Sequence, residues 1–247
     1  MRIDLNIPEK WESLTDKQLA YFSKLSMEGI PRPEFLTLCL MEFTGLKLLK
    51  KHEGEGNFHF SKNGQSFTID IEMWQTLCNK ISWMIDTVGQ VRNPSKIGLT
   101  RGCNQRFYGV SLEQMLLSDN YYNAYIKTRN IKMLARLTAI FYQLPWQHFK
   151  SWKIEKRSGY FLWYKKHMNI VIIWYTGVRM SFLERFPYLF QKSGENGYQS
   201  PEEIVLNVLS ALNNGDITKN EKLYKSPAIE ALKQLNNLAE RAAKLNK

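Results

Sequence analysis

Apolar residues recur every three or four positions through most of the chain, which is the spacing of helices with one buried face. Thr15 and Gln18 have the spacing of a capping box, which predicts a helix from there to about Glu28. The same periodicity over residues 33–43 predicts a second helix, and Gly45 has the position of its C-terminal cap. The N-terminal part of the chain therefore begins with two short helices.

One segment instead alternates apolar and polar residues. Residues 58–69 show this period of two on both sides of Asn63-Gly64, the pair that suits a tight type I′ turn. This pattern predicts a single β-hairpin. Asp70 directly follows it and is an expected N-cap of a helix that reaches about Val88.

The middle of the chain is interrupted and then helical again. Gly, Pro and Asn break any periodicity over residues 89–110, which favours either a functional basic loop or irregular hairpin, or a solvated linker between two helical halves. Ser111 begins a capping-box pattern, and helical spacing continues with breaks to Tyr142. Residues 146–158 are a basic connector, and we expect a long helix over residues 159–186.

The C-terminal part contains two further helix signals. Ser200-Pro201-Glu202-Glu203 combines a cap, a proline at the first helical position and an acidic residue in the first turn, so a helix is expected to about Leu212. After a polar spacer, Ser226-Pro227 opens a last, amphipathic helix. Its apolar face can dock on its own domain, on a second copy or on a partner. The candidate partner-binding residues on that face are Leu232, Leu235, Ala239 and Ala242.

These patterns together predict a mainly α, multi-helix globular protein with one small β-hairpin near residues 58–69. We divide it into an N-terminal helical segment with the hairpin (1–88), a basic loop (89–110), a helical core (111–213) and a spacer with the amphipathic helix (214–247). All four segments can also belong to one domain, because 247 residues are within the size of a single core.

Charge is concentrated in the middle of this sequence. The chain has a net charge of +11, but residues 91–192 alone hold 17 Lys and Arg against 4 Asp and Glu, a net charge of +13. A concentrated basic segment indicates a polyanion or an acidic partner. The residues that we select for partner or nucleic-acid binding are Arg92, Lys96, Arg101, Arg106, Trp146, Trp152, Lys153, Lys156, Arg157, Lys165 and Lys166.

Aromatic residues interleave with these cations, and residues 141–190 hold 15 of the 32 aromatic side chains. Exposed, they could stack on nucleic-acid bases, anchor a protein partner or touch an anionic membrane. If these aromatic residues are buried, they form the core-facing side of a central helix. We favour this interpretation for residues 168–186. Exposure is better supported between Trp146 and Trp152, where aromatic and basic residues share a short segment.

Signatures of catalysis and metal binding are missing from the sequence. The 4 His and 3 Cys residues have no metal-ligand spacing, and no nucleophile, phosphate-loop or dinucleotide motif occurs. We expect no cofactor, no metal and no enzyme activity. The longest charge-free apolar run, Met168 to Val178, is shorter than the about 20 residues of a membrane span. We therefore expect an intracellular protein that does not enter a membrane.

Three stretches together resemble a poorly characterised family of mainly helical proteins encoded by phages and prophages of Bacteroides-type gut bacteria. The stretches are Ile7–Trp11 with Leu14-Thr15 and Gln18-Leu19; Arg106–Gly109 followed by Leu134–Tyr142 and Pro145; and Gly215–Glu221 before the last helix. The family's genes lie near those of tail assembly, so the resemblance implies a structural-module role and brings no catalytic residues.

The expected function follows from the charge and the resemblance. The first hypothesis is a non-catalytic tail or virion assembly chaperone or adaptor that binds another viral protein, such as a structural or tail component. It would act in the host cytoplasm or stay with the virion. The alternative is a nucleic-acid-binding protein that uses the basic region 91–166.

Overall fold

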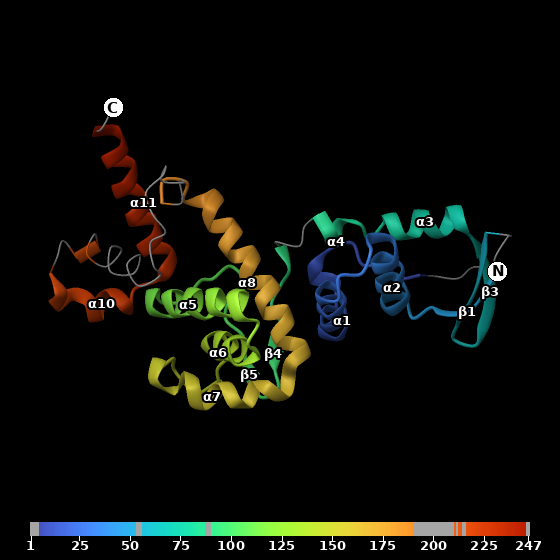
Figure 1. The fold of residues 1–247 in the computed structure, drawn as a ribbon, viewed down its shortest axis with the longest axis horizontal. Helices are drawn as coiled ribbons and strands as arrows, with labels where there is room; N and C mark the ends of the chain where they lie inside the picture. The colour runs from blue at the N-terminus through green and yellow to red at the C-terminus, as the bar shows by residue number, and fades with distance from the viewer. Residues whose placement is uncertain are drawn as a thin grey trace.

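The structure, a computed structural model, describes residues 5–52, 56–86, 90–189, 210, 212–213 and 216–245. These residues form a mainly helical protein with two small antiparallel sheets (Figure 1), which confirms the predicted fold class. The helix expected from Ser200 falls outside the described residues except at positions 210 and 212.

The two N-terminal helices form as their caps predict. A 3₁₀ turn, η1 (Trp11–Ser13), precedes α1 (Asp16–Met27) and α2 (Arg32–Thr44). The backbone N–H of Gln18 donates to Thr15 Oγ1 at 3.2 Å, and the Thr15 N–H donates to Gln18 Oε1 at 2.8 Å. Gly45 adopts a φ of +71° and ends α2, because a residue without Cβ enters the left-handed region at little cost.

The predicted hairpin belongs to a three-stranded meander of β1 (Lys47–His52), β2 (Asn57–Lys62) and β3 (Gln65–Asp70). Asn63 and Gly64 take φ values of +51° and +79°, as the predicted tight turn requires. The sequence analysis missed β1, which pairs with β2 through an irregular register. Four of its six residues are Lys or His, so it carries little apolar signal.

The helix predicted from Asp70 to Val88 is wrong in its length. Asp70 caps α3 (Ile71–Asn79) as expected, accepting a hydrogen bond of 2.7 Å from the Met73 N–H. The helix ends at Asn79, and a tight turn leads to the short α4 (Trp83–Asp86). Ile81 in this turn and Met84 in α4 are fully buried.

The segment after residue 90 is an irregular hairpin, one of the two predicted alternatives. Its strands β4 (Lys96–Ile97) and β5 (Thr100–Arg101) pair antiparallel. Ile97 and Phe107 are buried in the core that also contains the following helices. The solvated linker is therefore excluded for the described residues, because the segment contributes to the core.

The helices after this hairpin differ from the prediction at one point. Ser111 caps the first of them as predicted, accepting from the Gln114 N–H at 3.2 Å. The single helix expected over residues 159–186 is wrong, because the chain becomes helical five residues earlier and breaks at Tyr164, whose φ and ψ of −116° and 39° are not helical. The elements are α5 (Leu112–Thr128), α6 (Ile131–Phe141), η3 (Ser151–Lys153), α7 (Ile154–Phe161), η4 (Leu162–Tyr164) and α8 (Lys165–Arg185).

The predicted polar spacer before the last helix contains two short helical elements, η5 (Ile217–Lys219) and α10 (Asn220–Tyr224). The last helix, α11 (Ala228–Leu245), starts where Ser226-Pro227 predicts. Backbone hydrogen bonds from Leu112 to Ser226 (2.9 Å) and from Ala228 to Val110 (2.9 Å) attach its start to that of α5.

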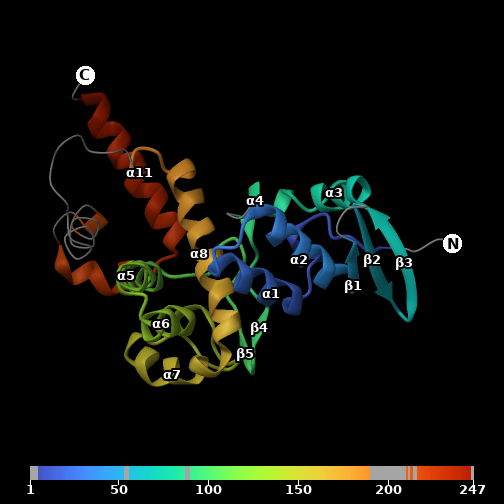
Figure 2. The same cartoon turned by 45° about the vertical axis from the view of Figure 1, so that its right-hand side comes forward.

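Buried side chains gather in two clusters that share α8. The first cluster is formed mainly by the elements from η1 to α4, and the second by β4, the 107–110 segment and the helices from α5 onward. Ile170 of α8 belongs to the first cluster, whereas Val171, Trp174 and Tyr175 of the same helix belong to the second. Figures 1 and 2 show α8 between the two parts of the molecule. Because α8 is buried on opposite sides, its sequence is apolar nearly all round.

Candidate binding surfaces

The predicted basic residues separate into two places in the folded protein. Arg92 and Arg106 line a groove beside α8, whereas the other candidates lie on or near β4–β5, the loop that follows α6, α7 and the start of α8. We therefore describe the groove and the region around β4–β5 and α7 separately.

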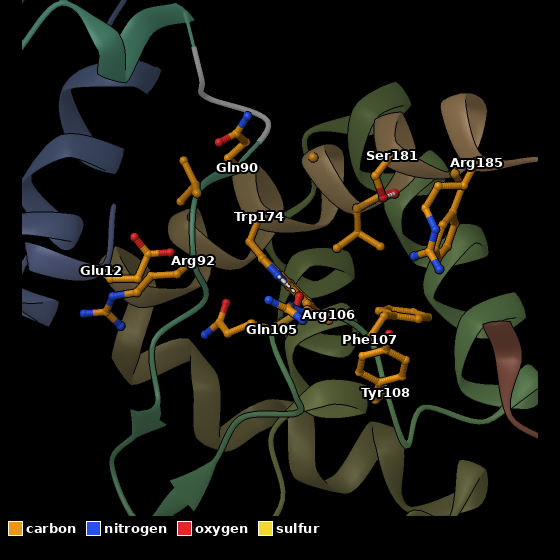
Figure 3. Close-up of a pocket in the computed structure, with 14 residues that line it drawn as sticks. Glu12, Gln90, Arg92, Gln105, Arg106, Phe107, Tyr108, Trp174, Ser181 and Arg185 are labelled. Atoms are coloured by element: carbon orange, nitrogen blue, oxygen red, sulfur yellow. Dashed lines mark hydrogen bonds between the residues drawn. The ribbon is translucent and has the colours of Figure 1, made fainter. Parts of the chain in front are cut away.

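The groove beside α8 is a cavity of about 490 Å³ between the 105–108 loop and the C-terminal half of α8 (Figure 3). The indole N–H of Trp174 donates to the carbonyl of Gln105 at 3.4 Å and holds the loop against the helix. In Figure 3, Arg92 lies beside Glu12 at one end of the groove, and Arg185 lies at the other end. Arg185, which the sequence analysis did not select, adds a second exposed cation to Arg106.

Arg92 has a structural role in this groove. Its Nη2 lies 2.8 Å from Asp16 Oδ1 and donates to the Leu14 carbonyl at 2.7 Å, and its side chain is largely buried. Its charge is thus neutralised by α1, and the contact joins the 90–95 segment to the N-terminal helices. Asn93, next to it, is also buried: its backbone N–H donates to Gln105 Oε1, and its carbonyl accepts from Gln105 Nε2, both at 2.8 Å.

A second region combines exposed aromatic residues with cations. The side chains of Trp146 and Trp152 are 74% exposed, that of Trp163 is 85% exposed, and that of Leu99 in the β4–β5 turn is 75% exposed. Aromatic residues are enriched at protein interfaces relative to the rest of the surface. We define the basic-aromatic surface as these four residues together with Lys96, Arg101, Lys150, Lys153, Lys156, Lys165 and Lys166.

Lysine side chains hold one of these tryptophans in place. The ammonium of Lys153 lies 4.9 Å from the ring centroid of Trp152, and that of Lys150 lies 5.9 Å from it. Each contact is a cation–π interaction, worth about 0.5–1 kcal/mol at an exposed site. The indole therefore stands in the solvent with a defined orientation and with positive charge on its faces.

The β4–β5 turn is attached to α7 and η4. The backbone N–H of Leu99 donates to the hydroxyl of Tyr160 at 3.1 Å, and that hydroxyl donates to Tyr164 Oη at 3.3 Å. Gly98 has a φ of +57°, and its missing side chain leaves room for both tyrosine hydroxyls. The turn therefore keeps Leu99 at a fixed place on the basic-aromatic surface.

Arg157, one of the predicted binding residues, points into the protein. Its Nη2 donates to the Ala139 carbonyl at 2.6 Å, while Nε and Nη1 are buried without a hydrogen-bond partner among the described residues. Burial lowers the pKa of this guanidinium below its ordinary value. The side chain lines a cavity of about 290 Å³ under the β4–β5 turn.

The predicted partner-binding face of the last helix is divided. Leu232 and Leu235 are buried, and Leu232 belongs to the same core as α5. Ala239 is half-buried and Ala242 is exposed, beside the exposed Leu238. The N-terminal half of the face is thus occupied by the chain itself, and only its C-terminal half is accessible.

In the described ranges no group of three or more His, Cys, Asp or Glu side chains could hold a metal ion. No helix of the described residues is both long and apolar enough to cross a bilayer. Cys39 and Cys78 are buried thiols, and burial raises the pKa of Cys39 to about 12.

Four contributors to these surfaces were not predicted from the sequence: Leu99, Lys150, Trp163 and Arg185. Trp163 precedes Tyr164 and two lysines, a local combination of aromatic and basic residues like that at Trp152, which could have revealed it. Assigning it to one continuous helix hid this signal. Leu99 and Arg185 carry no comparable local pattern, because only the tertiary fold exposes them.

Comparison of the chain with family models, with curated proteins and with solved structures finds no match.

Proposed function

We propose that the protein is a non-catalytic assembly chaperone or adaptor of a phage structural module, which binds a viral structural or tail protein through its basic-aromatic surface. The observation that carries this proposal is the exposure of Trp146, Trp152 and Trp163 among lysines. Tryptophan is the residue most enriched among energetic hot spots of protein interfaces, because its large rigid ring buries much apolar area on binding. The resemblance to phage tail-neighbourhood proteins supports the viral nature of the partner.

The surrounding charge indicates what the partner presents. Lys96, Arg101, Lys156, Lys165 and Lys166 are all exposed, and the ion pairs found among the described residues involve none of them. Exposed cations of one sign steer an acidic partner and raise its association rate. The proposed partner surface is therefore apolar at its centre and acidic at its rim. Binding would occur in the host cytoplasm, and the complex could remain in the virion.

Affinity capture from phage-producing cells tests this proposal. The wild-type chain is expected to retain a viral structural protein, and the triple variant W146A/W152A/W163A should lose about tenfold or more of it, because hot-spot truncations each cost about 2 kcal/mol or more. The matched control is L49A/I71A/M73A, which removes three exposed apolar side chains from the other part of the molecule. Equal recovery by both triple variants would contradict the proposal.

Nucleic-acid binding is the second candidate, and the cation–π pairs at Trp152 favour it. An exposed ring bordered by Lys150 and Lys153 can stack on a base while the ammonium groups neutralise phosphates. Generic single-stranded and duplex DNA would then bind with an affinity that falls steeply between about 50 and 200 mM salt. Fluorescence anisotropy measures this dependence, and no binding at the lower salt concentration eliminates this candidate.

A further inference from the structure

One wall of the groove beside α8 is a single face of that helix. The residues of this face recur every three or four positions, as Trp174, Gly177, Val178, Ser181, Phe182 and Arg185. Gly177 has no side chain and Ser181 has a short one, which leaves room beside the rings of Trp174 and Phe182. The groove volume of about 490 Å³ is within the range of ligand sites, about 300–1,000 Å³.

The opposite wall is the loop around Phe107, which is ordered before any ligand binds. Phe107 has a φ of +65°, in the left-handed region that bulky residues rarely adopt. Its ring is buried, with centroid distances of 5.4 Å to Phe182 and 6.3 Å to Trp174, and this packing holds the strained backbone in place. Arg106 and Tyr108, on either side of Phe107, are exposed and line the groove. Because this wall is already ordered, binding costs little further conformational entropy.

Two arginines give the groove an accessible positive charge. Arg106 and Arg185 are both exposed and both line it. Among the described residues, neither guanidinium forms an ion pair with a carboxylate or a hydrogen bond. Their N–H donors are therefore available to an anion that enters from solvent.

The two ends of the groove differ in charge. Figure 3 shows Glu12 beside Arg92 at one end and Arg185 at the other, and the charge of Arg92 is already neutralised by Asp16. A ligand with carboxylates at one end of an apolar group therefore has one favoured direction, with its carboxylates away from Glu12. A nucleic acid that followed the groove would bring phosphates near Glu12, which disfavours it.

We propose that the groove beside α8 binds a short acidic segment of a protein partner, which carries an apolar side chain next to its carboxylates. The apolar side chain would pack on Val178 and Phe182. The carboxylates would pair with Arg106 and Arg185, whose planar groups offer N–H donors that match two carboxylate oxygens. The inference goes beyond the proposed function, because none of these residues belongs to the basic-aromatic surface.

Peptide titration of the full-length protein, followed through the ¹⁵N–¹H signals of the tryptophan indoles, tests the site directly. The probe is the capped peptide Leu-Phe-Glu-Glu, and the matched neutral peptide is Leu-Phe-Gln-Gln. We expect the acidic peptide to shift the signal of Trp174, whose indole bonds the Gln105 carbonyl in the groove wall, and to bind about tenfold or more tightly than the neutral one. The signal of Trp152, on the basic-aromatic surface, is the internal control and should not move.

Four outcomes of these titrations would overturn the inference. They are no shift of Trp174 at millimolar acidic peptide, a larger shift of Trp152 than of Trp174, equal affinity for the acidic and neutral peptides, and a shift of Trp174 by a single-stranded DNA oligonucleotide but not by the peptide. The capped peptide Ser-Ser-Glu-Glu tests the apolar contact and should bind about tenfold more weakly than Leu-Phe-Glu-Glu. Equal affinity of these two acidic peptides would show that only general electrostatic attraction acts, and would also overturn the inference.

Paired charge variants assign the binding to the groove, and isothermal titration calorimetry measures their affinity for Leu-Phe-Glu-Glu. R106Q/R185Q should lose about tenfold or more of it. K96Q/R101Q removes the same charge from exposed positions that do not line the groove, and should stay within about threefold of wild type. Wild-type affinity of R106Q/R185Q, or an equal loss in both double variants, would contradict the inference.

S181W fills the groove without removing a charge. Ser181 is half-buried on the groove face of α8, whereas Met180 beside it is 52% exposed and does not line the groove. S181W should therefore weaken peptide binding by about tenfold, and M180W should leave it within about threefold of wild type. Unchanged affinity of a folded S181W would overturn the inference. W146A/W152A/W163A should bind the peptide as wild type does, and a tenfold loss in this variant would place the peptide on the basic-aromatic surface instead.

Discussion

At the scale of single residues, the aromatic side chains of positions 141–190 divide between core and surface. Tyr142, Phe161 and Tyr175 are fully buried, whereas Trp146 and Trp163 stand in the solvent. The hydroxyls of the buried tyrosines form hydrogen bonds. The hydroxyl of Tyr142 donates to the Pro94 carbonyl at 2.6 Å. Burial holds the pKa of Tyr142 well above its ordinary value, so the hydroxyl keeps its proton and remains a donor at neutral pH.

The hydroxyl of Tyr142 is expected to stabilise the fold. In Y142F the Pro94 carbonyl loses its buried donor, which costs about 1–3 kcal/mol of the free energy of unfolding. Urea denaturation followed by circular dichroism measures this loss. The control is Y108F, since Tyr108 is exposed and no hydrogen bond of its hydroxyl is found among the described residues. Equal stabilities of Y142F and wild type would show that the hydrogen bond contributes nothing.

At the scale of secondary-structure elements, the β4–β5 turn depends on one glycine. Gly98 combines a positive φ with a close approach of two tyrosine side chains. An added Cβ would overlap the hydroxyl of Tyr160 and lie 2.7 Å from that of Tyr164. Gly64, in the β2–β3 turn, also has a positive φ, but no atom would lie within 4 Å of its Cβ.

The two glycines therefore form a matched pair for mutagenesis. G64A should cost only the backbone strain of a left-handed residue, about 1–2 kcal/mol. G98A adds a steric clash to the same strain and should lower the free energy of unfolding by more than G64A does. Equal costs of the two substitutions in chemical denaturation would contradict the close packing of the turn on α7. Adding Y160F to G98A should recover part of the difference, because the overlapping hydroxyl is then gone.

The last helix is expected to be part of the fold rather than an appendage. Leu232 is buried against α5, whereas Leu238 on the same helix is exposed. L232A should lower the free energy of unfolding by about 2–5 kcal/mol, through lost burial and the cavity that remains. L238A should change it by about 0.5 kcal/mol or less, as for other surface substitutions. Similar effects of the two changes in thermal denaturation would show that α11 does not pack as described.

At the scale of the whole molecule, α8 connects the two hydrophobic clusters. Ile170 is fully buried among the N-terminal helices, while its neighbour Val171 is fully buried in the other cluster. The ion pair of Arg92 with Asp16 adds a polar contact between the 90–95 segment and α1. The N-terminal cluster is thus completed by a residue that lies about 80 positions beyond its last helix.

Because both hydrophobic clusters include residues of α8, we expect the two parts of the protein to unfold cooperatively. We expect a single thermal transition with coincident midpoints by circular dichroism and tryptophan fluorescence. I170A should lower the free energy of unfolding by about 2–5 kcal/mol and keep the transition single. Two resolved transitions, of which I170A shifts only the first, would show that the parts unfold independently.

Local sequence determined where several of the described helices begin. Thr15, Asp70 and Ser111 cap helices as predicted, because a capping side-chain oxygen and the backbone N–H that donates to it lie within three residues of each other. The Asn63-Gly64 turn formed for the same reason, since its backbone preference is intrinsic to the two residues. The mainly helical fold class follows from these signals and from the apolar periodicity. The sequence also located the positive charge between residues 91 and 192.

Only the tertiary structure decided which of the basic and aromatic side chains are accessible. Arg92 and Arg157 carry the same charge as Lys156 and Lys165, yet the first two are turned into the protein and the others into solvent. The break at Tyr164 was likewise not predicted by the apolar spacing; Phe161 before it is buried and Trp163 is exposed. Such choices are set by contacts between residues far apart in the chain, and no local pattern encodes them.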